Sequence, residues 1–356
     1  MKERASKESR SKITKKLLAT AKDYIAAKVV LFSACQDHQT TAGIDNVRKL
    51  CLSFVPEGTK GGACTSLFLQ VLYHNYKLQQ EYNRRRRDSS DSNHEHLQSK
   101  LAHPPPSITY GTILNHMQQV CERNNYTQIP LLSCSRPIHL YKDPFQIVPD
   151  NFVQKSPQGT KRALIIGITY TNSPHALAGC QNDCRNVIAF LKKVHSFEDE
   201  DITLLLDDPV ACDDLNQPTK KNILRTFRTF SMQCQEGDVV FIHYAGHGIA
   251  VEARSCDEPD CFQEALLPVD YMTSGEILDV DIFRLLLIPM PKNVLVTALF
   301  DCCHSGTILD LPFQYSGANP VCDYDSVVFP HMQMVEDFRD RMRKVKKTQD
   351  LQDSKS

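Results

Sequence analysis

Two short segments hold the residues of this sequence that are able to do chemistry. HYAGHG at 243–248 places two histidines among glycines, and DCCHSG at 301–306 contains an acid, two thiols and an imidazole. A thiol with an imidazole as its base is the nucleophile of covalent catalysis on carbonyl groups. Each segment ends an apolar run that is typical of a buried strand. The carboxyl ends of parallel strands lie at one edge of a sheet, so the two segments meet there if their strands are neighbours.

His247 is the stronger candidate for the base. Gly246 and Gly248 flank it, which lets the backbone turn sharply and approach a substrate closely. The backbone N–H groups of Gly248 and Cys303 are the candidate donors of an oxyanion hole. A histidine that only packed in the core would not need a glycine on each side, so the pattern favours catalysis.

The other reactive side chains of the two segments are weaker or undecided candidates. His243 lies within its predicted strand, and we expect a packed, hydrogen-bonded core residue. Cys302 and Cys303 are adjacent, so one faces inward and the other faces the site, and alternation does not choose between them. His304 is a weaker base than His247, because residues adjacent on a strand or turn point apart.

The elements that must position these residues alternate between strand and helix. Apolar runs predict the strands, and a periodic apolar face predicts the helices. Alternation of this kind predicts an α/β fold with a mostly parallel central sheet and helices on both faces. The predicted strands are 163–170, 202–208, 238–248 and 293–303, and the predicted helices are 182–194, 219–230 and 278–288.

A second block precedes this one and spans about 22–145. It contains predicted strands at 26–35 and 129–134 and predicted helices at 62–76 and 109–124. We expect a disordered insert at about 79–106, because its polar stretch at 79–100 cannot bury enough apolar surface to pack.

The rest of the chain divides into a basic N-terminal segment at 1–21, a linker at 146–162 with Pro and Gly punctuation, the catalytic block at 163–315 and a tail at 316–356. Apolar side chains at helical spacing in the tail predict a docking helix; they are Met332, Val335, Phe338 and Met342.

The composition narrows the class of protein. Of 356 residues, 41% are hydrophobic and 23% are charged, and the net charge of -1 argues against a general nucleic-acid binder. No apolar run reaches the roughly 18 residues of a membrane span, and the basic start lacks the apolar stretch of a signal peptide. We therefore expect a cytoplasmic protein, with a nuclear location as the alternative, that is a monomer, does not act at a membrane and keeps its 14 cysteines reduced.

The two reactive segments, in this order and context, resemble the catalytic segments of metacaspases, which are caspase-fold cysteine peptidases. The likeness continues through ALIIGITY, LAGCQND, EALLPVDY, ILDVDI and GTILDLPF. The first block resembles the small-subunit half of that family in VVLFSACQDHQT, GGACTSLFLQVL, SITYGTILNHM and TQIPLLSCSRPIHL. That half follows the large one in most of the family but precedes it here, which is similar to type III metacaspases. The resemblance implies a caspase-like fold with the order of the halves permuted.

The resemblance also implies roles for individual residues. Cys303 is the implied nucleophile and His247 the implied general base and acid, with no third member of a triad evident. The family cleaves after Arg or Lys, and an acidic pocket binds that residue. Two carboxylates in a partly dry cleft either meet a cation or have one pKa raised, and a guanidinium satisfies both of them. The residues implied for this pocket are Asp183, Asp301, Cys180, Cys35 and Asp37.

Asp183 has an alternative interpretation as an acid at the N-terminus of a helix, and the two roles are compatible.

Many metacaspases need calcium, which the resemblance places near the end of the large half. Asp279 and Asp310 match the aspartates of that site. Val280 and Gln263 stand where the family has further aspartates, so we expect a weakened or rearranged site to which Asp281 or Glu264 contributes. No organic cofactor is expected.

The exchanged order leaves no peptide bond at the usual self-cleavage junction, so we expect the intact chain to be active. A candidate self-cleavage site is the run Arg84, Arg85, Arg86 and Arg87, for which a solvated loop or a nuclear import patch is the alternative. Two other functions compete with a peptidase that acts on protein substrates. One is an inactive caspase-fold scaffold or regulator, and the other is a redox sensor built on Cys302 and Cys303, whose disulfide would be strained.

Overall fold

The computed structural model describes most of the chain between residues 16 and 343. Outside the description are residues 1–15, 17–18, 22, 35–41, 51, 57, 91–103, 154–158, 172, 209–213, 253–261, 318–326, 328–330, 341–342 and 344–356. In the described part, no helix is long and apolar enough to cross a membrane.

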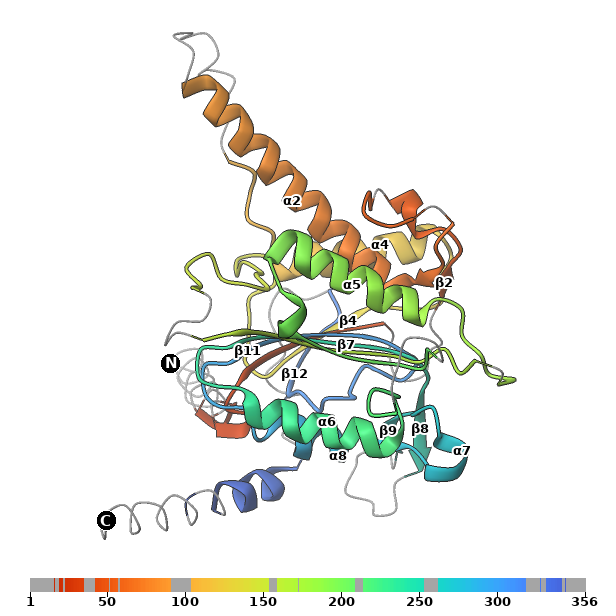
Figure 1. The fold of residues 1–356 in the computed structure, drawn as a ribbon. Coiled ribbons are helices and arrows are strands. Elements are labelled where there is room, and N and C mark those ends of the chain that lie inside the picture. Colours follow the sequence, from red (N-terminus) through yellow and green to blue (C-terminus); the bar gives the residue numbers. More distant parts are fainter. Residues whose placement is uncertain are drawn as a thin grey trace, which may run out of the picture.

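A seven-stranded sheet forms the centre of the molecule (Figure 1). Five neighbouring strands are parallel, and β4 runs antiparallel to both of its neighbours, β1 and β12. The predicted α/β fold with a mostly parallel sheet is therefore confirmed. In spatial order the strands are β12 (Phe313–Tyr315), β4 (Leu131–Cys134), β1 (Lys28–Ser33), β11 (Leu295–Asp301), β7 (Val239–Ala245), β5 (Lys161–Gly167) and β6 (Ile202–Leu206).

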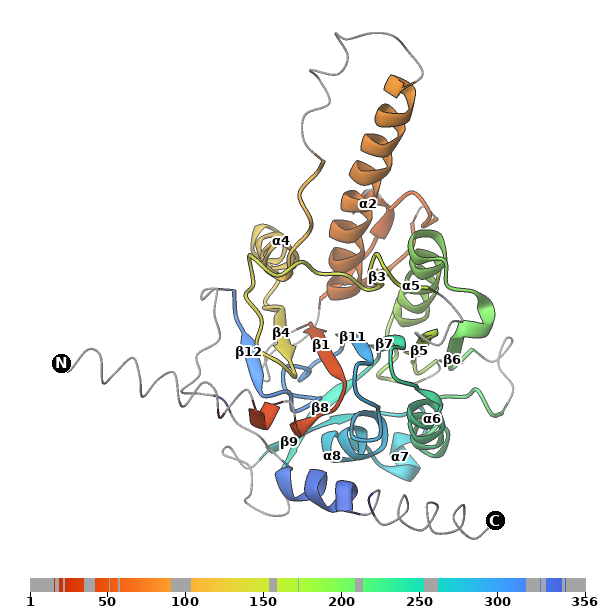
Figure 2. The same cartoon turned by 90° about the vertical axis from the view of Figure 1, so that its left-hand side faces the viewer.

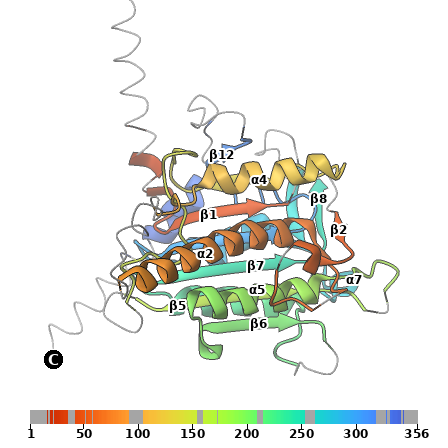
Figure 3. The same ribbon diagram turned by 90° about the horizontal axis from the view of Figure 1, so that it is seen from above.

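Helices cover both faces of this sheet, as the sequence predicts. On one face lie α2 (Ala63–Ser90), α4 (Tyr110–Arg123) and α5 (Cys180–His195), and Figure 3 shows them side by side above the strands. On the other face lie α6 (Lys220–Gln233) and α8 (Asp279–Ile282) (Figure 1). Threonine side chains at 109 and 219 accept hydrogen bonds from the first turns of α4 and α6 and so define where these helices begin.

Two hydrophobic cores form, one on each side of the sheet. Val30 and Phe32 of β1 belong to the first core, whereas Val29 and Leu31 of the same strand belong to the second. A strand buried on both faces needs apolar residues at every position, which explains the continuous apolar runs in the sequence.

The two sequence blocks share one sheet rather than forming separate domains. β1 of the first block pairs in parallel with β11 of the second, with Phe32 opposite Leu299. Ile147, in the predicted linker, is buried in the first core, and β5 already begins at Lys161. Ala21, in the predicted N-terminal segment, is also buried. The boundaries predicted from the sequence therefore do not separate independently packed domains.

The disorder predicted from residue 79 is wrong for the first part of the insert. α2 continues to Ser90 and extends well beyond the body of the molecule (Figure 2). Gln, Glu and Arg are good helix formers even when they are exposed, and Arg85 forms an i,i+4 ion pair with Glu81. The helix therefore does not need burial to persist past the packed region.

Smaller elements complete the fold. The predicted helix at 278–288 forms as α8 followed by the π-helix η3 (Phe283–Leu287). In the tail, a helix covers 332–340 and buries Val335, while Met342 lies outside the described residues. The remaining elements are β2 (Gly43–Ile44), β3 (Gly61–Gly62), β8 (Gly248–Glu252), β9 (Phe262–Leu266), β10 (Ile277–Leu278), α7 (Tyr271–Ser274), η1 (Val47–Leu50) and η2 (Asp199–Asp201).

Candidate active site

The sheet register brings His247 and Cys303 to the same edge. β7 and β11 are parallel neighbours, and their last pair is Ala245 with Asp301. His247 and Cys303 each lie two residues beyond this last pair. The backbones are in close contact there, because a Cβ at Gly248 would stand 2.1 Å from the carbonyl oxygen of Cys303. A side chain at 248 would therefore force the two segments apart.

Gly248 is needed for this close approach, and the turn of the chain lies at Gly246. The chain bends at Gly246, as predicted, although neither Gly246 nor Gly248 has a positive φ. At Gly246, a Cβ would stand 2.7 Å from the hydroxyl of Tyr244. Both glycines make room for neighbouring groups of the protein, and the expected close approach to a substrate stays a prediction.

His247 is held in one orientation by hydrogen bonds. Its Nε2 lies 2.7 Å from the backbone oxygen of His175, which can only accept. Nε2 therefore carries the hydrogen, and the lone pair that accepts a proton is on Nδ1. The group that orients His247 is thus a backbone carbonyl. Every residue has one, so the residue types in the sequence do not identify it.

The loop that carries His175 is fixed by Asp207 and Tyr170. Asp207 accepts hydrogen bonds from the backbone N–H groups of Thr169 and Tyr170 at 2.5–2.9 Å. The Tyr170 hydroxyl accepts from the N–H of His247 at 2.9 Å and donates to a backbone carbonyl at 267. Its φ of 54° is in the left-handed region, which a tyrosine adopts only when its surroundings hold it. Asp207 and Tyr170 are positioning residues that sequence reasoning missed.

The two adjacent thiols have different surroundings. Cys302 is fully buried in the second core, whereas Cys303 is half-buried. His304 has a positive φ of 50°, so the chain turns directly after Cys303. The burial of Cys302 also disfavours a redox sensor that needs both sulfurs accessible. His243 is a buried core residue, as predicted: its Nδ1 donates to the Leu299 carbonyl, and burial lowers its pKa to about 4.

Asp183 and Asp301 lie together beneath the start of α2. They are 2% and 6% exposed. Asp183 accepts a hydrogen bond from the backbone N–H of Gly62, and Asp301 accepts one from Thr65, both at 2.8 Å. Burial raises the pKa of both carboxyls, and the charge of Asp301 raises the pKa of Asp183 further. Asp183 also lies in the first turn of α5, so both interpretations of its role describe its position.

Glycines at 61 and 62 let β3 lie directly on these acids. A Cβ at Gly62 would stand 2.2 Å from an oxygen of Asp301, and one at Gly61 would stand 2.5 Å from Asp183. Cys180 belongs to the same cluster, since the charges of Asp183 and Asp301 raise the pKa of its thiol after burial. Cys35 and Asp37 lie outside the described residues.

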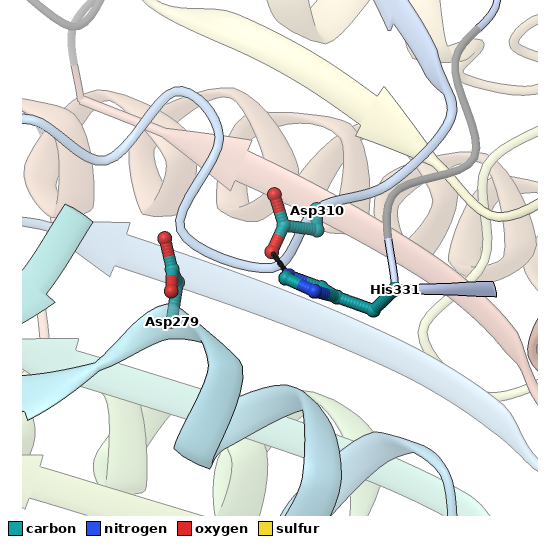
Figure 4. A group of neighbouring side chains, drawn as sticks. All are labelled: Asp279, Asp310 and His331. Carbon is teal, nitrogen blue, oxygen red and sulfur yellow. Dashed lines mark hydrogen bonds and ion pairs between the residues drawn. The ribbon is translucent and has the colours of Figure 1, made fainter. Parts of the chain in front are cut away.

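A second acidic cluster contains Asp279, Asp310 and His331 (Figure 4). One ligand atom from each lies within 4.8 Å of the others, and Nε2 of His331 lies 2.8 Å from Asp310. Burial, and then the charge of Asp310, raises the pKa of Asp279 to about 7. Two buried carboxylates next to an imidazole are a set of groups that fits a cation.

The fit to calcium specifically is poor. Calcium takes six to eight oxygen ligands, and only two aspartates join this cluster in the described part of the chain. Asp281 forms an ion pair with Arg284 instead. Gln263 lies on β9, opposite Val251 of β8. His331 was not predicted, because nothing in the tail's sequence pattern links it to a site in another half of the chain.

A half-buried thiol beside an oriented imidazole, at the carboxyl edge of a mostly parallel sheet, defines the class of caspase-like cysteine peptidases. Comparison with known proteins identifies the family within this class. Residues 161–312 match the family model described as metacaspase, peptidase C14 domain. Metacaspase III c of Phaeodactylum tricornutum is 34% identical over 293 residues, which cover 82% of this chain and 76% of that protein. The chain belongs to the metacaspase family.

Two fungal relatives match a shorter region. Metacaspase-1B of Aspergillus oryzae is 42% identical, and Metacaspase-1 of Saccharomyces cerevisiae is 40% identical, each over 158 residues. The match covers 44% of this chain in both cases, and 37% and 36% of the two relatives. This chain therefore matches less than half the length of these two proteins.

Proposed function

We propose that this chain is a cysteine endopeptidase that cleaves protein substrates after Arg or Lys. The observation that supports this specificity is the buried acid pair next to the nucleophile. Asp301 is two residues before Cys303, and neither it nor Asp183 forms an ion pair with a lysine or arginine among the described residues. A guanidinium would neutralise both carboxylates through paired hydrogen bonds.

The reaction follows from the orientation of His247. Nδ1 accepts the proton of the Cys303 thiol, and the thiolate forms a bond to the peptide carbonyl carbon. The N–H groups of Gly248 and Cys303 stabilise the oxyanion. The imidazolium then gives its proton to the leaving amine as the C–N bond breaks, and a water activated by Nδ1 releases the acyl group as a carboxylic acid.

Substrate entry requires β3 to move. The carboxylates are covered by Gly61, Gly62 and the first turn of α2, so a basic side chain reaches them only if this contact opens. Opening exposes the acids, and the arriving cation replaces the lost backbone hydrogen bonds. The acid pair thus favours a substrate that carries its own positive charge.

Cation dependence and single-chain activity are further parts of the proposal. The cluster of Asp279 and Asp310 supports control by a divalent cation, and calcium is the cation that the family resemblance implies. No cut at a junction between the halves is required. Cleavage at Arg84 to Arg87 is a separate proposal, and it requires the exposed end of α2 to unwind, because a peptidase binds its substrate extended.

The test is hydrolysis of fluorogenic peptides that end in Arg, Lys or Asp, with calcium, with zinc and with chelator. We expect turnover of Arg- and Lys-ended peptides, none of Asp-ended peptides, and none by Cys303→Ala or His247→Ala. A gel of the same samples would show whether activity precedes any cut. Absence of turnover by the intact wild-type chain under every condition would favour the inactive scaffold instead.

A further inference from the structure

The cluster in Figure 4 is assembled from three segments that are far apart in the sequence. Asp279 is the first residue of α8, and Asp310 lies on the loop that follows the thiol segment. His331 immediately precedes the helix of the tail, whose Val335 N–H donates to the His331 carbonyl. The tail therefore delivers an imidazole to two acids of the catalytic half.

We propose that Asp279, Asp310 and His331 form a site for a divalent cation that accepts nitrogen as well as oxygen, with zinc as the representative. A neutral imidazole suits zinc, cobalt and nickel, whereas calcium prefers oxygen ligands alone. Two carboxylates and one imidazole are a ligand set of the kind zinc binds, with a fourth position left for water. The site departs in this way from the calcium site that the family resemblance implies.

The three ligand atoms lie within 4.8 Å of one another, so small side-chain shifts would bring them to the bond lengths of about 2.0–2.2 Å that zinc requires. Nε2 of His331 and a carboxylate oxygen of Asp310 lie 2.8 Å apart and share a hydrogen. A cation bound to both atoms would lie between them. A cation would replace the shared hydrogen and bind the lone pair of Nε2. Asp279 is oriented by the backbone N–H groups of Glu264 and Val280, at 3.0 and 2.5 Å, so it is held in place before any cation arrives.

Packing contacts also hold the imidazole of His331 in place before any cation binds. The ring of His331 lies 5.4 Å from the ring of Phe283, and Val335 is buried against the second core. Tyr24 donates a hydrogen bond to the backbone oxygen of Asp310 at 3.1 Å. Ligands whose orientation is fixed by outer contacts bind metal better than mobile ones. An occupied site would link the tail to the loop that carries Cys303.

The experiment uses the full chain with Cys303→Ala, under reducing conditions, so that it does not depend on the proposed peptidase activity. Calorimetric titration with zinc is expected to show a site that is weakened at least about tenfold by His331→Ala, the size of loss typical when even an outer partner of a metal ligand is removed. Asp310→Asn should weaken it as well. His74→Ala, an exposed histidine on α2, is the matched control and should change nothing.

A second measurement tests whether His331 binds zinc or only supports the folding of the tail. Zinc should slow tryptic cleavage of the tail in the Cys303→Ala chain and should not do so after His331→Gln, which keeps a polar side chain but loses the imidazole. Zinc affinity and tail protection that are both unchanged by the His331 substitutions would overturn the proposal. So would the absence of zinc binding, or tight calcium binding that is insensitive to His331, because the site would then use oxygen alone.

Discussion

Two pairs of buried aspartates lie on opposite faces of the sheet and balance their charge in different ways. Asp183 and Asp301 face α2, accept hydrogen bonds from the backbone N–H groups of Gly62 and Thr65, and form no ion pair with a lysine or arginine among the described residues. Asp279 and Asp310 face the other core. His331 of the tail places its imidazole beside them and forms a hydrogen bond with Asp310. Burial raises the pKa of three of these four carboxyls, namely those at 183, 279 and 301.

The difference supports the proposal that a basic substrate side chain binds to the pair at 183 and 301. Backbone N–H groups supply only partial positive charge, so the pair at 183 and 301 is left incompletely neutralised. The pair at 279 and 310 instead has the imidazole of His331 within hydrogen-bond distance of Asp310. We infer that the first pair selects a basic side chain and that the second serves structure or control.

The largest expected effect is on the first pair. Asp301→Asn should lower kcat/KM for Arg-ended peptides by about 100-fold or more, because breaking a buried charge pair typically costs about 3–5 kcal/mol. Asp199→Asn, on an exposed acid paired with Lys192, should have almost no effect. Steady-state kinetics with Arg-ended peptides measures both. Equal activity in the Asp301 variant and the wild type would contradict the assignment of a cation-binding role to this pair.

A steric change at the same place should have the next largest effect. Gly62→Ala puts a Cβ about where the Asp301 carboxylate stands, at 2.2 Å, and should lower kcat/KM for Arg-ended peptides about tenfold or more. Gly43→Ala is the matched control in the paired strand β2, where the nearest atom is 3.9 Å away. If both variants behave alike, the contact between β3 and the acids is not what shapes the pocket.

The pH dependence of stability should distinguish Asp183 from an ordinary surface acid. Its pKa is raised in the folded state, so its contribution to stability is present below the unfolded pKa near 3.9 and is lost as pH rises through the folded pKa. Asp183→Asn should remove this loss, and each pKa unit corresponds to about 1.4 kcal/mol. Urea unfolding between pH 4 and 8 measures it. A variant that is less stable than wild type at pH 8 would show that the buried charge is already neutralised.

The smallest effect is expected from the tail. Val335→Ala removes buried methyl groups from the tail helix and should lower stability by about 1–2 kcal/mol. Hydrolysis of Arg-ended peptides should stay within about twofold, because the acid pair on the other face is untouched. Thermal unfolding and peptide kinetics provide the two readouts. A strong loss of activity without unfolding would instead couple the tail to the first pair.

Local sequence pattern predicted the elements that carry the catalytic residues. Continuous apolar runs identified the strands that end before His247 and Cys303, because strands buried on both faces are apolar at most positions, with His243 of β7 as an exception. Helix propensity in an exposed stretch was underestimated, so α2 is longer than predicted. The acid pair and the nucleophile came from the family resemblance, and not from spacing.

Contacts between distant segments account for what the sequence did not predict. The His175 carbonyl has no side-chain signature, and Asp207 acts through backbone N–H groups of the loop that follows β5. His331 meets Asp310 only because the tail folds back onto the second core. Such pairings depend on tertiary packing, and periodicity within one segment does not encode them.

The most direct test of the account is covalent labelling by a peptide chloromethyl ketone that ends in Arg, followed by mass spectrometry of the digested chain. The account predicts alkylation of Cys303 in the wild type, strong reduction of labelling in Asp301→Asn, and no labelling by the matching reagent that ends in Asp. Alkylation of Cys302, or equal labelling by the Arg- and Asp-ended reagents, would contradict it.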